Sequence, residues 1–440
     1  MLYYNPNHQT NNEENYNNKQ ITDFIKLEKI GTGQFSTVYK VKDIKNGNIY
    51  AMKVIEKRPE NEKEEQKKQI KREINNLEKC YHWENNYNTV KLFNYFETKE
   101  QYILIFNYCD TTLENYINEN YPNKKMPLEK IKLLFLELNQ GFKNLYEEKV
   151  IHRDIKINNI LIEYKFGDKT DFRPRLADFG ISRENSTLNN PMTASISWLL
   201  LSPPEILLNG TDYSFASDLW SIGVLLYKIA FGKYPYEGKG AVELYMKIMQ
   251  GPQNLEKSGD QNFDDLISRL LHKDKERRIT YEEYFNHPFF IFKEPDSIIN
   301  FNNKYNFNIS SYIREFRTEN KNGNILLQEL SIIDFVKLKE LNLESCSISD
   351  LMPLTNDVFK NLILLNLQYN YIYDLRPLKN IKFLNIKLMF FGFNKIKDIS
   401  PLENIPFKCL QTIGLLGNPL NWDENNKRIY NKIIKKNQEN

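Results

Sequence analysis

The sequence lacks the features that mark secreted, membrane-spanning and zinc-stabilised proteins. Only 4 of its 440 residues are cysteines, and no paired metal-ligand spacing occurs among Cys80, Cys109, Cys346 and Cys409. This scarcity argues against a structural zinc site and favours reduced thiols inside the cell. The longest apolar stretch, around residues 222–231, is broken by Lys228 and is too short to span a bilayer. Residues 1–20 have neither a basic start nor an apolar run, so we expect no secretory signal and a soluble, cytoplasmic protein.

A large net charge is also missing. The 60 lysines and arginines nearly balance the 57 aspartates and glutamates, which leaves a net charge of +3. No global field therefore attracts a polyanion, and we expect no nucleic-acid partner. Hydrophobic residues make up 41% and charged residues 27% of the chain, as in globular proteins. At this length the chain exceeds what one hydrophobic core organises, so we expect two or three folding units.

The order of hydrophobic patterns predicts an α+β architecture. Residues 1–21 are polar and asparagine-rich, which predicts a disordered tail. Between residues 24 and 106, short β-type runs surround one helical stretch whose apolar residues recur at helical spacing, at Ile70, Ile74 and Leu77. From residue 128 to 290 helical periodicity prevails. We therefore predict one domain with a β-rich first lobe and an α-helical second lobe at 22–295, followed by a linker or helical cap at 296–337.

Residues 338–440 contain a pattern of apolar residues that recurs at a fixed spacing along the sequence, which we call the repeat period. One repeat period separates Leu338 from Leu362, Leu362 from Ile386, and Ile386 from Leu410. The first set of matched positions contains Leu338, Leu341, Leu343, Cys346, Ile348, Leu351 and Leu354. The position of Cys346 is taken in the next three repeats by Asn370, Asn394 and Asn418. Four such repeats and a C-terminal cap predict a short α/β solenoid, in which each repeat buries its apolar side against its neighbours.

A glycine-containing segment lies between two β-type runs near the start of the first domain. It comprises Ile30, Gly31, Thr32, Gly33, Gln34, Phe35, Ser36, Thr37 and Val38. Glycines let a backbone close over phosphate groups without interference from Cβ, although the segment alone is more typical of an ordinary hairpin turn. Lys53 on a β-type run and Glu73 on the helical stretch favour the phosphate-binding hypothesis. Lys53 would hold the nucleotide phosphates while Glu73 fixes its ammonium, whereas as isolated residues both are typical of solvated surface charges.

Two further motifs carry the strongest signal. The first reads His152-Arg153-Asp154-Ile155-Lys156-Ile157-Asn158-Asn159, and the second, a short distance downstream, reads Asp178-Phe179-Gly180. Each motif alone arises easily by chance, but both at this spacing, downstream of the lysine and glutamate, do not. Residues 24–290 therefore resemble the eukaryotic protein kinases, and the resemblance implies a two-lobed protein kinase fold.

The resemblance implies a binding site for ATP and Mg²⁺. Asp154 would accept or orient the proton of the substrate hydroxyl, and Lys156 would neutralise the transferring phosphoryl group. Asn159 and Asp178 would hold Mg²⁺. The adenine would lie among the apolar side chains of Ile30, Val38, Ala51 and Leu161. The segment that joins the lobes, with Asn107 and Cys109 behind a bulky Phe106, would offer backbone groups to its edge.

The resemblance also implies a substrate class and a mode of regulation. Lys156, two residues after Asp154, is similar to the pattern of serine/threonine kinases, which implies protein substrates with Ser or Thr acceptors. Arg153 implies a phosphorylated residue that orders the activation segment, for which the candidates are Thr187, Thr193, Ser195 and Ser197. Glu205 and Arg278 would form a buried ion pair that anchors the end of this segment.

The repeats resemble the leucine-rich repeats of intracellular proteins. Such surfaces bind other proteins, and Leu388 and Phe390 are expected to face outward on this one. Alternatively, this face packs on the kinase domain or on the linker. For the whole chain, the alternatives to an active kinase are a non-catalytic scaffold that presents the repeats, and a kinase that regulates the repeats by autophosphorylation.

Overall fold

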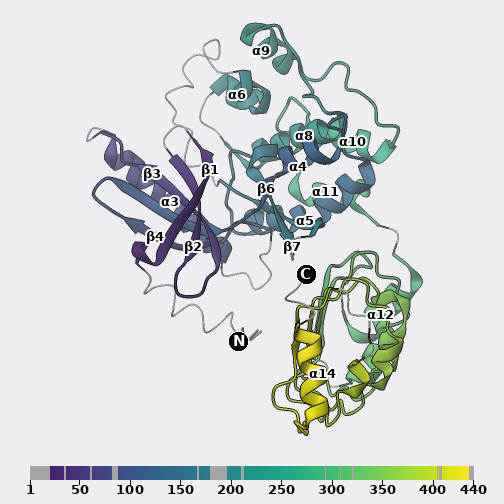
Figure 1. The fold of residues 1–440 in the computed structure, drawn as a ribbon. Coiled ribbons are helices and arrows are strands. Elements are labelled where there is room, and N and C mark those ends of the chain that lie inside the picture. Colours follow the sequence, from purple (N-terminus) through teal and green to yellow (C-terminus); the bar gives the residue numbers. More distant parts are fainter. Residues whose placement is uncertain are drawn as a thin grey trace. The chain divides into compact units, whose positions relative to one another are not determined.

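The chain folds into two compact units with separate hydrophobic cores (Figure 1). Unit 1 is Met1–Ile291 and unit 2 is Phe292–Asn440. The computed structural model describes residues 20–33, 36–59, 62–81, 88–165, 168–178, 196–209, 213–292, 294–307, 309–319, 322–403, 405 and 409–435.

The first lobe of unit 1 is an antiparallel sheet with one long helix, as the sequence predicts (Figure 1). The sheet has the strand order β1-β2-β3-β5-β4. Its strands are β1 Phe24–Thr32, β2 Ser36–Asp43, β3 Ile49–Glu56, β4 Leu92–Glu97 and β5 Gln101–Asn107. The helix α3, Lys63–Tyr81, buries the predicted stripe of Ile70, Ile74 and Leu77. Its opposite side is rich in lysine and glutamate, so the helix is amphipathic and packs by that one stripe.

The second lobe of unit 1 is predominantly helical, also as predicted. Its helices are α4 Leu113–Asn120, α5 Leu128–Glu147, α6 Ile196–Leu201, α7 Pro204–Asn209, α8 Phe215–Phe231, α9 Ala241–Gln250, α10 Gln261–Leu270 and α11 Tyr281–Phe285. A small sheet of order β6-β7-β8 joins them, formed by Thr111–Thr112, Ile160–Lys165 and Asp168–Leu176. Short 3-10 helices occur at Ile21–Asp23, Ile157–Asn159 and Pro288–Phe290.

Helix α8 is the centre of this lobe because it is apolar on nearly every side. At its beginning, Ser214 N donates to Ser217 Oγ at 3.3 Å, and it ends at Gly232, whose φ of 71° is the left-handed conformation that glycine adopts most easily. Gly223 lets α10 approach closely, since a Cβ there would lie 2.8 Å from the Cβ of Leu270. Among the helices that the structure describes, neither α8 nor any other is long and apolar enough to cross a membrane.

Unit 2 is built on a parallel sheet of order β13-β12-β11-β10-β9. Its strands are β9 Glu315–Arg317, β10 Glu340–Asn342, β11 Leu364–Asn366, β12 Leu388–Phe390 and β13 Thr412–Gly414. From β10 to β13, Leu341 pairs with Leu365, Leu365 with Met389 and Met389 with Ile413, so each residue pairs with its equivalent in the next repeat. The repeat period found in the sequence is therefore the strand register of the sheet.

The segments between these strands hold short 3-10 helices where an α/β solenoid predicts α-helices. They are Met352–Thr355, Asp357–Phe359, Arg376–Asn380 and Ser400–Leu402. Proline stands in the first turn of three of them, at Pro353, Pro377 and Pro401, and these segments are too short for an α-helix to develop. The α-helices of unit 2 lie before and after the repeats, at α12 Asp296–Tyr305, α13 Gly323–Leu330 and α14 Glu424–Lys435 (Figure 1).

Buried asparagines tie successive repeats together. Asn394 Nδ2 donates to the carbonyls of Leu367 at 2.8 Å and Phe391 at 3.0 Å, and its Oδ1 accepts from Ile372 N at 2.9 Å. Asn370 and Asn418 make the same kinds of contacts in their own repeats. Each asparagine thus satisfies backbone groups of two turns that would otherwise be buried without partners.

The segment predicted as a linker or cap, 296–337, contributes structure to unit 2. It contains α12, α13 and the strand β9, which adds a fifth strand to the sheet beside β10. Leu388 and Phe390, predicted to face outward, flank Met389 of the core; Leu388 is partly exposed, but Phe390 is covered and only 5% exposed. Its ring lies against Gly414 of the next strand, where a Cβ would be 3.0 Å from Phe390 Cδ1.

Candidate active site

A cleft of about 300 Å³ lies between the two lobes of unit 1. Eleven of the residues predicted for a nucleotide site line it: Ile30, Gly31, Val38, Ala51, Lys53, Glu73, Phe106, Asn107, Cys109, Leu161 and Asp178. The strands β1, β2 and β3 supply one wall, and β7 with the segment after β8 supplies the other. Sequence-distant motifs are thus brought to one cavity, with apolar side chains on both walls.

The glycine segment forms the turn between β1 and β2 at this cleft. Gly31 pairs with Val38 and Thr32 with Thr37 across the two strands, and Gly33 N donates to Ser36 O at 2.7 Å. A Cβ at Gly33 would lie 2.9 Å from Ser36 Oγ, so a larger residue there would require the Ser36 side chain to rotate away. Gln34 and Phe35, at the tip of this segment, lie outside the described residues.

The predicted ion pair between β3 and α3 is confirmed, and a second carboxylate joins it. Lys53 Nζ lies 3.6 Å from Glu73 Oε1 and 2.6 Å from Asp178 Oδ1. Burial disfavours the charged form of Lys53, but the two carboxylates outweigh it and raise the pKa of the ammonium. Burial raises the pKa of Glu73 to about 7, although the charge of Lys53 opposes this. Lys53 stays charged, and its charge lowers the pKa of Asp178.

The catalytic-loop motif is held by a buried carboxylate of α8. Asp218 accepts hydrogen bonds from the backbone N–H of His152 at 2.7 Å and of Arg153 at 2.9 Å. Burial raises the pKa of Asp218 to about 6, against the effect of these two donors. Arg153 has a φ of 68°, an unfavourable backbone conformation for a non-glycine residue, and the Asp218 contacts fix it there. The Arg153 guanidinium lies 5.9 Å from the centre of the Tyr213 ring.

Three residues of the motif form a hydrogen-bonded group. Lys156 Nζ lies 2.7 Å from Asp154 Oδ2, and Asn159 Nδ2 donates to the same oxygen at 2.8 Å. Asn159 Nδ2 also donates to the backbone carbonyl of Asp154 at 2.8 Å. These two bonds orient the Asn159 amide so that its NH₂ group faces Asp154. Asp154 is therefore held as an acceptor beside a cation, which suits a group that orients a hydroxyl.

The carboxylate of Asp178, which lines the cleft, and the amide oxygen of Asn159, which does not, are donors that suit a hard divalent cation. Asp178 contributes a carboxylate that is 55% exposed, and Asn159 has its amide oxygen left over after both N–H bonds to Asp154. Oxygen ligands of these two kinds are those that Mg²⁺ takes, together with phosphate oxygens and water. Protein kinases bind ATP and a divalent metal, and the residues that the resemblance assigns to the metal fit it.

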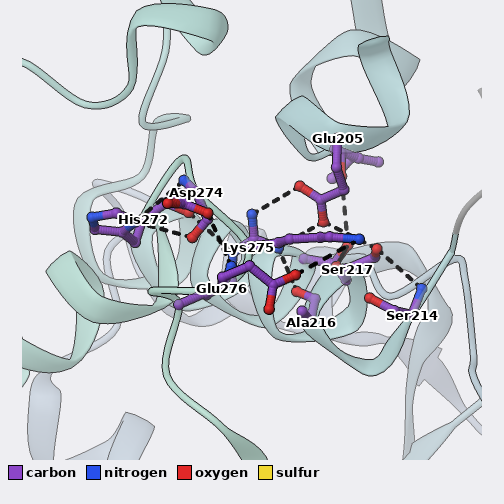
Figure 2. Close-up of polar contacts among 11 residues, drawn as sticks. Glu205, Ser214, Ala216, Ser217, His272, Asp274, Lys275 and Glu276 are labelled. Carbon is purple, nitrogen blue, oxygen red and sulfur yellow. Dashed lines mark hydrogen bonds and ion pairs between the residues drawn. The ribbon is translucent and has the colours of Figure 1, made fainter. Parts of the chain in front are cut away.

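The predicted Glu205–Arg278 ion pair is confirmed, and Figure 2 labels Glu205 together with Ala216, Ser217 and His272 of the surrounding network. Arg278 NH1 and NH2 contact the two carboxylate oxygens of Glu205 at 2.8 and 2.9 Å. Arg278 also donates to Ala216 O at 2.6 Å and to His272 O at 3.1 Å, and Ser217 Oγ donates to Glu205 at 3.1 Å. This network joins α7 to the beginning of α8 and to the loop before α11.

Cys109 lies in the segment that joins the lobes and lines the cleft. Burial raises the pKa of its thiol to about 12, and Arg175 only partly offsets this. Asn107 Nδ2 lies 3.4 Å from its sulfur. The thiol therefore remains protonated at neutral pH and contributes to the cleft as an apolar group.

The hydrogen bonds of several residues at the mouth of the cleft were not predicted. Asn158 Nδ2 donates to Glu114 Oε2 at 2.5 Å, and Thr112 Oγ1 caps α4 by accepting from Asn115 N at 3.2 Å. Thr112, Asn115 and Asn158 line the cleft. A threonine directly before a helical segment is a capping signal that could have located α4, although no sequence signal pairs Asn158 with Glu114.

Part of the predicted site lies outside the described residues. This holds for Phe179 and Gly180 of the second motif and for three of the four candidate phosphorylation sites, Thr187, Thr193 and Ser195. Ser197 lies in α6, and its side chain is also outside the description.

Comparison with known proteins identifies the family. A family model described as protein kinase domain matches residues 24–290, the range that the motifs predict. Serine/threonine-protein kinase 36 of Mus musculus is 28% identical over 263 residues, which cover 60% of this chain and 19% of that protein. Cyclin-dependent kinase 14 of Xenopus tropicalis is 28% identical over 300 residues, which cover 61% of this chain and 67% of that protein. The family model takes in more than half of the residues, and the chain therefore belongs to the protein kinase family.

Proposed function

We propose that the chain is an ATP-dependent protein serine/threonine kinase that transfers the γ-phosphate of ATP to Ser and Thr hydroxyls of protein substrates. The observation that carries the proposal is the meeting of Lys53, Glu73 and Asp178 at one cleft. A scaffold that had lost catalysis would not need this buried group of charges, which is costly to desolvate. A relative that matches the catalytic domain carries the name serine/threonine-protein kinase.

Each side chain of the cleft has a distinct task in this proposal. Lys53, fixed by Glu73, holds the phosphates of ATP. Asp154 orients the substrate hydroxyl and receives its proton, and Lys156 stabilises the negative charge that develops on the transferring group. Asn159 and Asp178 hold Mg²⁺, which neutralises phosphate charge when bound.

The adenine end of the cleft is formed by both lobes. Ile30, Val38 and Ala51 cover one side of the base and Leu161 the other, as their places in the cleft lining support. The backbone between Asn107 and Cys109 offers hydrogen bonds to its edge. The glycine segment, including Thr32, Gly33, Gln34, Phe35, Ser36 and Thr37, closes over the phosphates.

Activation by phosphorylation is part of the proposal. Arg153 would bind a phosphate group on Thr187, Thr193, Ser195 or Ser197 and order the activation segment. Its guanidinium lies near the Tyr213 ring in this structure, so a phosphate would add charged hydrogen bonds to an arginine already held in place. Alanine at the true site should sharply lower activity, and undiminished turnover in all four single variants would refute this mode of regulation.

We also propose that unit 2 is a leucine-rich-repeat solenoid that binds a protein partner. The match between repeat period and strand register and the buried asparagines of successive repeats support the solenoid. We place the protein in the cytoplasm as part of this proposal, because Cys109 and Cys409 are free thiols, as a reducing compartment maintains.

Phosphate transfer from ATP and Mg²⁺ to a generic protein acceptor tests the kinase proposal. The assay compares the intact chain with Asp154→Asn, which keeps the size and most hydrogen bonds of the side chain but cannot take a proton. Transfer to Ser or Thr should fall by about 100-fold or more, the contribution of a positioned base. No transfer by the parent chain, even after treatment with an activating kinase, would favour the scaffold hypothesis instead.

A further inference from the structure

The turns that follow the strands of unit 2 form a second hydrogen-bonded ladder. Ser345 N donates to Gln368 O at 3.1 Å, Tyr369 N to Gly392 O at 3.0 Å and Phe393 N to Leu416 O at 2.7 Å. Equivalent turn residues therefore lie side by side at the spacing of neighbouring strands, about 4.8 Å. We call the four residues Ser345, Tyr369, Phe393 and Gly417 the turn column.

Every residue of the turn column has a left-handed backbone. Its φ values are 57° at Ser345, 55° at Tyr369, 57° at Phe393 and 77° at Gly417. This conformation suits glycine and is unfavourable for a bulky side chain. Since the fold accepts serine and glycine at the equivalent positions, it does not require an aromatic residue at Tyr369 or Phe393. Strained residues that the fold does not require point to a functional role.

The aromatic side chains of the column are exposed. Tyr369 is 50% and Phe393 42% exposed, and their rings stack at a centroid distance of 4.5 Å with an interplanar angle of 3°. The far face of Phe393 lies on Gly417, where a Cβ would be 2.5 Å from Phe393 Cδ1. The next residue beyond Tyr369 is Ser345, which is too small to cover the second face of the tyrosine ring. That face is open to a ligand.

Charge and apolar surface are separated along this edge. At one end Glu344, which precedes Ser345, accepts a hydrogen bond from Asn366 at 3.0 Å and has no ion-pair partner among the described residues. At the other end Leu416, which precedes Gly417, is 61% exposed. Three strand spacings, about 14 Å, separate these two positions. The neighbouring ring of Tyr371 already has Lys395 Nζ 4.6 Å from its centre, so a tyrosine of this edge does pair with a cation.

We propose that this edge of unit 2 binds a protein segment that carries an arginine or lysine and, about four residues away, a bulky apolar side chain. The cation stacks on the open face of Tyr369 and pairs with Glu344, and the apolar side chain packs on Phe393 and Leu416. An extended segment covers about 14 Å in about four residues, which sets the spacing between the two anchors. The inference rests on the proposed partner-binding role of unit 2 and names the chemistry of the partner.

A random dodecapeptide library displayed on phage and panned on the full chain tests the inference. The recovered peptides should carry Arg or Lys three to five positions from a Leu, Ile, Phe or Trp, in one order throughout. Synthetic copies, measured by fluorescence anisotropy, should bind the double variant Tyr369→Ser/Phe393→Gly at least 10-fold more weakly. That variant uses residues that the column already contains, so it should fold. Glu344→Gln should weaken only peptides that carry the cation.

Two controls separate the inference from the partner-binding role on which it rests. Leu384, 60% exposed but outside the turn column, gives the matched variant Leu384→Ser, which should leave peptide binding unchanged. Peptides whose binding survives the double variant but is lost in Leu388→Asp, on the strand face, would overturn this surface and leave partner binding intact. Enrichment of no peptide, or of sequences without a cation, would also overturn the inference. So would binding of a U₁₂ RNA probe by the aromatic column in place of peptide.

Discussion

Removal of Arg278 should destabilise the kinase domain by several kcal/mol. Its side chain is fully buried and makes two contacts with Glu205 and one each with the carbonyls of Ala216 and His272. Arg278→Met keeps much of the packing of the arginine stem but leaves the Glu205 carboxylate with Ser217 alone, and stranding a buried charge costs about 3 to 5 kcal/mol. Unfolding about 270 residues changes the entropy by about 0.57 kcal/mol per kelvin, so Tm should fall by about 5 to 9 °C.

Thermal unfolding of the full chain, followed by tryptophan fluorescence, measures this loss. Trp220, one of the four tryptophans, is fully buried and its ring lies 5.1 Å from the Arg278 guanidinium, so part of the emission reports on the site. Arg277→Met is the matched control, because the neighbouring arginine is 77% exposed and should change stability by less than about 0.5 kcal/mol.

The double variant Glu205→Met/Arg278→Met tests whether the unpaired Glu205 carboxylate causes the loss of stability. It removes the stranded charge together with its partner, so it should regain at least half of the lost stability. A single variant whose Tm equals that of the parent, or a double variant as unstable as Arg278→Met, would refute the reasoning.

Three further predictions concern other parts of the chain. Because the pKa of Glu73 is raised to about 7, its carboxylate takes up a proton as pH falls through that value, so kcat/KM for ATP should decline from pH 8 to 6. Glu73→Gln should lower kcat/KM by about 10- to 100-fold and abolish the decline at low pH, since it removes the carboxylate of the ion pair that fixes Lys53. An unchanged pH profile in the variant would exclude Glu73 as the source of the decline. Gly223→Ala places a Cβ 2.8 Å from Leu270 and should cost about 1 to 3 kcal/mol in thermal unfolding, while Gly240→Ala, with nothing within 4 Å, should cost clearly less. Asn394→Ala should destabilise unit 2 by about 2 to 4 kcal/mol, because it leaves buried backbone groups unpaired, and should accelerate hydrogen exchange at the amide of Ile372; protection equal to the parent would contradict it.

Both lobes and the repeats were predictable because each has a clear period. The apolar stripe predicted for α3 is the buried face of that helix, and the repeat period corresponds to the strand register of unit 2. The strand β9 escaped prediction for a physical reason. Its one buried apolar residue, Phe316, pairs with Leu341 at an offset that exceeds the repeat period by one position, and its neighbours Glu315 and Arg317 are charged.

The site was predictable where chemistry fixes residue types at short spacing, and not where it depends on tertiary contacts. Lys53, Asp154 and Asp178 belong to motifs that stand out in the sequence. The contact of Asn158 with Glu114 joins residues 44 positions apart, and neither residue type is unusual in its own segment. The burial that raises the pKa of Glu73 is likewise invisible in a helix with many other charges.

The strand register of unit 2 has a consequence for how the chain can change in evolution. Each strand from β10 to β13 presents the same hydrogen-bonding edge to the next, and each asparagine bridges only adjacent turns. Loss or duplication of one whole period therefore rejoins compatible edges, whereas an insertion of a few residues within a strand or turn breaks the ladder. The sheet of unit 2 can therefore lengthen or shorten by whole repeats. The kinase domain cannot, because its contacts join segments that are distant in the sequence.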